Sequence, residues 1–198
     1  MNKHLIATAV MAVGVMTSGA ASAAVTINAW DVADITFNNV TIHLNDGWTV
    51  PLDAEVSLTE ELPGIYAVGF HFDGLSGGPY HGGGLLSYTL TTSPGYLVDG
   101  VHLDSDVVNG PTTTTLVTKD VLPANLTLLS PNGQPDGWYS FSGAPSITVT
   151  DDFSAGLGVY KHATNSFNVT AVPEPETYAM MMAGLGVLGF LGRRRKAQ

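Results

Sequence analysis

The sequence contains no cysteine and has few positively charged residues. Without thiols the chain can form neither a disulfide framework nor a cysteine-based zinc site or nucleophile. Lysine and arginine together number 7 against 17 acidic residues, and charged residues make up only 12% of the 198 residues. Because an acidic chain of this kind repels phosphate backbones, nucleic acid is excluded as a partner.

The few basic residues lie mainly at the two ends of the chain. Between residues 24 and 171 only Lys119 and Lys161 stand against 15 of the acidic residues. This central stretch shows no break in composition and is long enough to bury a core of its own. We therefore expect one domain over residues 24–171, with a separate role for each end.

The N-terminal segment, residues 1–23, has the layout of a secretory signal peptide. Lys3 precedes an apolar run over residues 5–16, and small residues then lead to Ala21 and Ala23, the A-x-A pattern that signal peptidase cuts. The apolar run is shorter than the roughly 20 residues that a membrane-spanning helix needs. The segment predicts a signal helix that is removed after Ala23 during export.

The C-terminal segment, residues 172–198, combines three features in a fixed order. It begins with Pro173, Glu174 and Pro175, where the two prolines prevent a helix or a sheet ladder and leave the backbone extended. An apolar run over residues 178–191 follows and predicts a transmembrane helix through a thin or locally thinned bilayer. The chain then has a basic cluster that stays cytoplasmic and stops transfer, formed by Arg193, Arg194, Arg195 and Lys196.

This order of motif, helix and basic cluster resembles the PEP-CTERM sorting signal of exported Gram-negative bacterial proteins. The resemblance covers about the last 26 residues and implies recognition by an exosortase, a membrane-embedded cysteine transpeptidase-like enzyme that removes the tail. It implies that residues 173–175 are substrate residues with no catalytic part. Glu176 stands where the family often has Ser or Thr, which bears on the position of the cut.

The resemblance also implies a route and a destination. The chain would be anchored transiently in the inner membrane and would then reach the cell surface or the extracellular space. Because the family is linked to bacteria that build exopolysaccharide, a role in biofilm or matrix follows from the resemblance.

The central stretch has the pattern of an all-β fold. Short runs of β-branched and aromatic residues recur between clusters of Gly, Pro, Asn and Asp, which is typical of a single antiparallel β-sandwich, either jelly-roll or immunoglobulin-like. Residues 65–72 and 85–91 alternate apolar and polar side chains as half-buried strands do. The alternation slips at Asn38 and Asn39, which predicts a bulge or a tight turn there.

Two groups of residues are candidates for ligand binding in this domain. The segment 99–110 holds Asp104, Asp106 and Asn109, and it is either an irregular Ca²⁺ loop or an ordinary solvated turn; the spacing does not fit an EF-hand. Aromatic side chains beside turns, Trp48, Tyr80 and Trp138, either form a sugar-stacking surface or cap the ends of the sandwich.

The leading hypothesis is therefore a non-enzymatic exported protein without a cofactor. The alternatives are a carbohydrate- or calcium-binding module and, third, a secreted hydrolase. Residues 74–78 fit the pattern G-x-S-x-G. A nucleophile elbow requires a helix directly after the serine, and the sequence Gly-Gly-Pro at residues 77–79 does not form one. His71 and His81 flank this glycine-rich loop and would share a metal ion only if the loop folds back.

Overall fold

Twelve β-strands account for most of the residues that the computed structural model describes, namely 22–27, 34–51, 53–72, 83–108, 115–154, 159–173 and 179–188. The strands are β1 (Ser22–Thr26), β2 (Ile35–Phe37), β3 (Val40–Leu44), β4 (Glu55–Leu62), β5 (Ile65–His71), β6 (Gly84–Thr92), β7 (Tyr96–Val108), β8 (Leu116–Leu122), β9 (Leu126–Pro131), β10 (Tyr139–Ala144), β11 (Ser146–Ser154) and β12 (Val159–Ala171).

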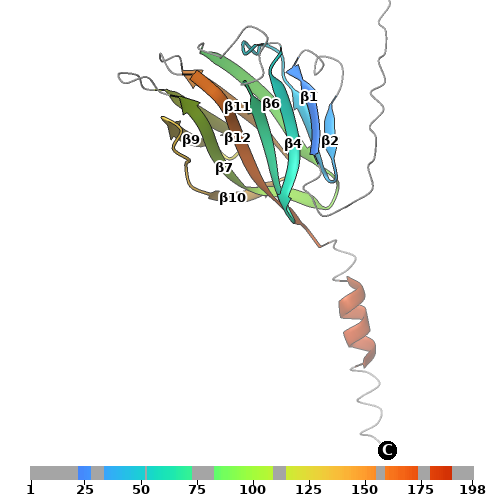
Figure 1. Ribbon diagram of the computed structural model, residues 1–198. Helices are drawn as coiled ribbons and strands as arrows, with labels where there is room; N and C mark the ends of the chain where they lie inside the picture. Colours follow the sequence, from blue (N-terminus) through green and yellow to red (C-terminus); the bar gives the residue numbers. More distant parts are fainter. Residues whose placement is uncertain are drawn as a thin grey trace, which may run out of the picture.

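The strands form two antiparallel sheets packed as a sandwich (Figure 1). Sheet A has the order β1-β4-β5-β12-β7-β10, and sheet B has the order β2-β3-β6-β11-β8-β9. The expectation of an all-β antiparallel sandwich is confirmed.

Four strand pairings nest inside one another along the chain. They join β5 to β12, β6 to β11, β7 to β10 and β8 to β9, and they fall alternately in sheet A and sheet B. A long hairpin that is folded over on itself has this nesting, which is the strand order of a jelly roll rather than of an immunoglobulin-like sandwich. The strands β1–β4 widen the two sheets beside β5 and β6.

The core lies between the sheets and follows the alternation that the sequence predicts. From β5 and β6 the large apolar side chains that are fully or almost fully buried are Tyr66, Val68, Phe70, Leu86, Tyr88 and Leu90. Burial of each large apolar side chain contributes about 1.5–3 kcal/mol, so these two strands alone account for a large part of the stability.

Tight turns join neighbouring strands at positions where the backbone needs a positive φ. Asn38 has φ 51° between β2 and β3, and Phe37 pairs with Val40, so the predicted slip at Asn38 and Asn39 is a two-residue hairpin. Gly64 has φ 81° in the equally short turn between β4 and β5. A side chain at Gly64 would also meet the carbonyl oxygen of Val169 at 2.9 Å.

The segment that the sequence analysis read as a calcium loop or a turn is mostly strand. Residues 99–108 belong to β7 and pair with β12. The stretch is a strand because polar His102 and Asp104 alternate with the buried Val101, Leu103 and Ser105. The many polar residues of the segment hide this alternation when the segment is judged by composition. A turn or irregular loop was therefore wrong as the conformation up to Val108, whereas calcium binding by Asp104, Asp106 and Asn109 stays a prediction.

The described part of the C-terminal segment contains a helix over residues 179–188 (Figure 1). Ten residues rise about 15 Å, half of the roughly 30 Å hydrocarbon core of a bilayer. Among the described residues no helix has both the length and the apolar character needed to cross a membrane. The predicted C-terminal transmembrane helix is therefore not supported. Of the predicted signal segment, residues 1–23, residues 1–21 lie outside the described residues, and Ser22 and Ala23 begin β1.

Candidate functional site

The end of the sandwich and the start of the C-terminal signal meet at one point of the fold. The last residue of β12, Ala171, pairs with Tyr96, and the amide of Val172 donates a hydrogen bond of 2.7 Å to the carbonyl oxygen of Gly95. Pro173 comes next, is exposed, and has no N–H with which to extend the ladder. Val172, which makes this hydrogen bond, is thus the residue directly before the Pro-Glu-Pro motif.

An open, mainly apolar groove lies at this junction. The turn between β6 and β7 lines one side, Pro145 between β10 and β11 lines a second, and the chain leaving β12 lines the third. Its lining includes Pro94, Tyr96, Leu97, Pro145, Val172 and Pro173. The structure thus holds the first proline of the motif at the surface of the domain. Glu174, Pro175 and the basic residues 193–196 lie outside the described residues.

The predicted signal-peptidase site lies beside the first strand. Ala21 is outside the described residues, whereas Ala23 is part of β1 and pairs with Leu58 of β4. A cut after Ala23 would leave Ala24–Thr26 to complete this edge strand, together with the hydrogen bond from the Ile27 amide to the Ala54 carbonyl at 2.9 Å. The expected mature chain therefore keeps a shortened β1.

Of the three turn-borne aromatic residues, the structure describes Trp48 and Trp138, which lie at different places on the sandwich. Trp48 is half-buried against the core, next to Thr49, whose amide bonds the carbonyl of Leu85 at the start of β6 in sheet B. Trp138 instead lies over Gly100 on the outer side of sheet A, with its Cε3 atom 3.7 Å from the position of a Cβ there. Tyr80 lies outside the described residues.

Trp138 stands in a small exposed cluster of its own. Its ring stacks on His102 with centroids 5.4 Å apart, and half of its surface stays exposed. Asp136 accepts hydrogen bonds from the amides of Leu129 and Gly137, both 2.8 Å, and from the hydroxyl of Tyr139 at 3.1 Å. Partial burial alone would raise the pKa of Asp136, but these hydrogen bonds outweigh it and hold the pKa below its ordinary value. A stacking ring and a fixed acceptor thus lie side by side.

The calcium candidates are placed as a strand requires. Asp104 and Asp106 both lie in β7, where Asp104 pairs with Thr164 and Asp106 with His162 of β12. Asn109 lies outside the described residues. Among the residues that the structure describes, no group of three or more His, Asp or Glu side chains is arranged to hold a metal ion.

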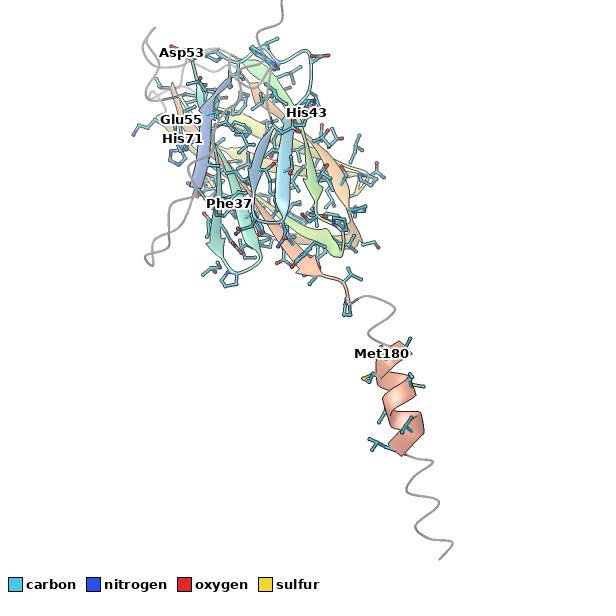
Figure 2. The ribbon with its side chains drawn as sticks, turned by 90° about the vertical axis from the view of Figure 1, so that its right-hand side faces the viewer. Phe37, His43, Asp53, Glu55, His71 and Met180 are labelled. Carbon is cyan, nitrogen blue, oxygen red and sulfur yellow. The ribbon has the colours of Figure 1, made fainter. Side chains whose placement is uncertain are left out.

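Two histidines lie side by side on the outer face of sheet A. His71 and His162 are cross-strand partners with ring centroids 6.2 Å apart, and the Nε2 atom of His71 is 3.1 Å from the hydroxyl of Ser57. Glu55 pairs with His71 on its other side, as Figure 2 shows. His81, like the glycine-rich segment 74–78, lies outside the described residues, so the idea of a metal shared between His71 and His81 stays a prediction.

The interior of the sandwich holds a polar cluster that the sequence analysis missed. Lys119 of β8, Asp151 of β11 and Asn165 of β12 all have 0% exposed surface. Lys119 and Asp151 are directly opposite each other in sheet B, and Asn165 faces them from sheet A, donating a hydrogen bond of 2.6 Å from Nδ2 to Oδ2 of Asp151. Both charged residues fall into the alternation of buried apolar residues in their strands, with Val117 and Val121 around Lys119 and Val149 and Phe153 around Asp151. Continued alternation would have placed them inside.

The comparison with protein families identifies the C-terminal signal. Residues 171–196 match the family described as the PEP-CTERM protein-sorting motif. No curated protein matches the chain. The chain is thus a β-sandwich protein that carries a PEP-CTERM sorting motif directly after its last strand. The motif implies export, processing by an exosortase and a membrane-anchored sorting signal.

Proposed function

We propose that this chain is a non-enzymatic exported protein whose jelly-roll domain is the mature product. Signal peptidase removes residues 1–23, an exosortase removes the C-terminal signal, and the domain of residues 24–171 is delivered to the cell surface or the extracellular matrix. There it serves a structural role associated with exopolysaccharide.

The observation that carries the proposal is the junction at Val172. The Pro-Glu-Pro motif begins directly after Val172, so a cut after Pro173 leaves the hydrogen bond of Val172 and the ladder of β12 intact. The sheet ladder resists proteolysis, and the ladder stops at the start of the motif, because Pro173 has no N–H with which to extend it. The fold thus supports release of an intact domain.

The distribution of charge supports the same sequence of events. All three arginines of the chain are in residues 193–195, so their removal leaves Lys119 and Lys161 as the basic residues of the domain. Lys119 is buried and Lys161 is exposed. The released domain therefore has a strongly acidic surface, which favours solubility and disfavours anionic polymers as direct partners. A neutral exopolysaccharide fits this surface best.

Replacing Pro173, Glu174 and Pro175 by alanine in the native host tests the sorting step. The expected result is a full-length C-terminus in intact-mass spectra, with protein retained in the membrane fraction. The matched control is Pro94→Ala, which removes an exposed proline of the same groove outside the motif and should leave processing unchanged. Normal removal of the tail from the triple variant would refute recognition of this motif.

The cluster around Trp138 favours a second candidate function, binding of a neutral carbohydrate. The ring offers an apolar face to sugar C–H groups, and the oriented Asp136 carboxylate accepts from hydroxyl groups. Titration calorimetry with neutral oligosaccharides should show binding that Trp138→Ala abolishes and Trp48→Phe leaves intact. Equal affinity of both variants would contradict this site.

A further inference from the structure

A charged side chain in the middle of the sandwich has an unusual environment. The Nζ atom of Lys119 donates a hydrogen bond of 3.1 Å to the carbonyl oxygen of His102 in β7, on the opposite sheet, and lies 4.1 Å from the centre of the Phe167 ring. Lys119 therefore crosses the interior from sheet B to sheet A. Asn165 lies two residues before Phe167 in β12 and on the same face of the strand. The side-chain amide of Asn165 therefore neighbours the Phe167 ring that lies beneath Nζ.

The polar atoms around Asn165 are not all satisfied. Oδ1 of Asn165, Oδ1 of Asp151 and the hydroxyl of Tyr88 are buried without a hydrogen-bond partner. Each such atom costs about 1–3 kcal/mol in a folded protein, which is a reason to look for a role beyond packing. A primary amine, a carboxamide and a carboxyl group are thus enclosed together, and aromatic rings of Tyr88 and Phe167 lie against them with centroids 6.4 Å apart.

We propose that the side chains of Lys119 and Asn165 join in an amide cross-link between the two sheets, with Asp151 as the carrier of the proton. The nearness of the amine to the carboxamide, on facing strands of a closed interior, makes the reaction intramolecular and removes most of its entropic cost.

The step balances without any other reactant. The lone pair of the neutral Nζ attacks Cγ of Asn165, and a C–N bond forms. The Asp151 carboxylate takes a proton from Nζ and passes it to Nδ2, which lies 2.6 Å from its Oδ2 atom. The bond from Cγ to Nδ2 then breaks and ammonia leaves. One amide replaces another, no group is oxidised or reduced, and Asp151 ends as it began.

The electrostatics of the cluster suit this chemistry. Burial lowers the pKa of Lys119 to about 7, and the Asp151 charge only partly opposes this. Burial likewise raises the pKa of Asp151 to about 7, again partly opposed by Lys119. A large share of Lys119 is therefore the neutral amine near pH 7, whereas an exposed lysine is almost entirely protonated. A carboxyl group that titrates near the same pH both accepts and releases a proton easily.

The cross-link would give a covalent brace to a protein that has no disulfide. It would connect β8 to β12 and close the chain between residues 119 and 165, so that the inner strands of both sheets could not separate. This property concerns the folded domain alone and stands or falls independently of the sorting route.

Peptide mapping of the full-length purified protein by mass spectrometry tests the proposal. Chymotryptic digestion should yield one branched peptide that contains both Lys119 and Asn165, with a mass lower by about 17 Da, the mass of ammonia. Trypsin should fail to cleave after Lys119 but should cleave after the exposed Lys161. Separate peptides with Lys119 and Asn165 at full mass would overturn the proposal, and this result needs no variant.

Variants separate the cross-link from other losses of ammonia. The Asn-Gly pairs at residues 109–110 and 132–133 can also lose about 17 Da by succinimide formation, but without a branch. Lys119→Met and Asp151→Asn should lack the branched peptide, and the control Lys161→Met should retain it. Asn165→Asp should form the same link with loss of water, about 18 Da. A branched peptide that persists in Lys119→Met would also overturn the assignment.

Discussion

The hydrogen bond between Ser105 and Ser130 offers a quantitative test of the packing between the sheets. Ser105 lies in β7 of sheet A and Ser130 in β9 of sheet B, and their hydroxyl oxygens are 2.6 Å apart with 3% and 1% of each residue exposed. Replacing either serine by alanine leaves the other hydroxyl buried without a partner. We expect each single variant to lose about 1–3 kcal/mol of unfolding free energy.

The double variant distinguishes this reasoning from a simple loss of contacts. With both serines replaced, no unpaired hydroxyl remains, so the total loss should be smaller than the sum of the single losses by about 1–3 kcal/mol. Urea unfolding followed by fluorescence measures all three variants, and a loss of 2 kcal/mol moves the midpoint by about 1 M. Additive losses would refute the pairing. The exposed pair Thr91 and Ser146, 3.1 Å apart, is the control and should couple by less than 0.5 kcal/mol, roughly the limit for surface sites.

Three further expectations concern single positions. Gly64→Ala should lower the free energy of unfolding by more than about 1 kcal/mol in urea, because φ is 81° and the new Cβ would lie 2.9 Å from the carbonyl oxygen of Val169. Gly47→Ala has a positive φ but open space around the new Cβ, so it should lower the free energy of unfolding by less. Equal losses in the two variants would contradict this account. Phe72→Ala should cost about 3–5 kcal/mol, since its ring is fully buried, and a loss below 1 kcal/mol would be inconsistent with that burial. The lowered pKa of Asp136 means that its contribution to stability is present above the pKa of the unfolded chain, about 3.9, and disappears as the pH falls through the folded value. The stability difference between the wild type and Asp136→Asn should therefore shrink on acidification, as urea midpoints at several pH values would show, and a constant difference would count against the hydrogen-bonded carboxylate.

Much of the architecture could be predicted from local pattern. The alternation at residues 65–72 and 85–91 identified two core strands, and the slip at Asn38 marked a real hairpin. The prediction of strands failed in β7, where the segment was assigned from its content of polar residues and not from their alternation with apolar ones. In β7 the polar residues of the outer face were taken for a turn, although the intervening Val101 and Leu103 are buried.

The C-terminal signal is a property of sequence alone. The residue types of the motif at 173–175 and their order could be recognised without a structure, and the family match at residues 171–196 agrees with them. The transmembrane helix expected from hydropathy has no counterpart among the described residues, where the helix spans residues 179–188.

The linear sequence by itself determined the sorting motif at the C-terminal end, the strand content of the middle and which side chains are buried in its clearest strands. These properties depend on residues near one another in the chain. Only the tertiary structure decided the nested strand order and the meeting of Lys119, Asp151 and Asn165. Pairing between strands depends on the closure of the whole sandwich, which no local period encodes. The chemistry inside the domain therefore became visible only when the two sheets were placed face to face.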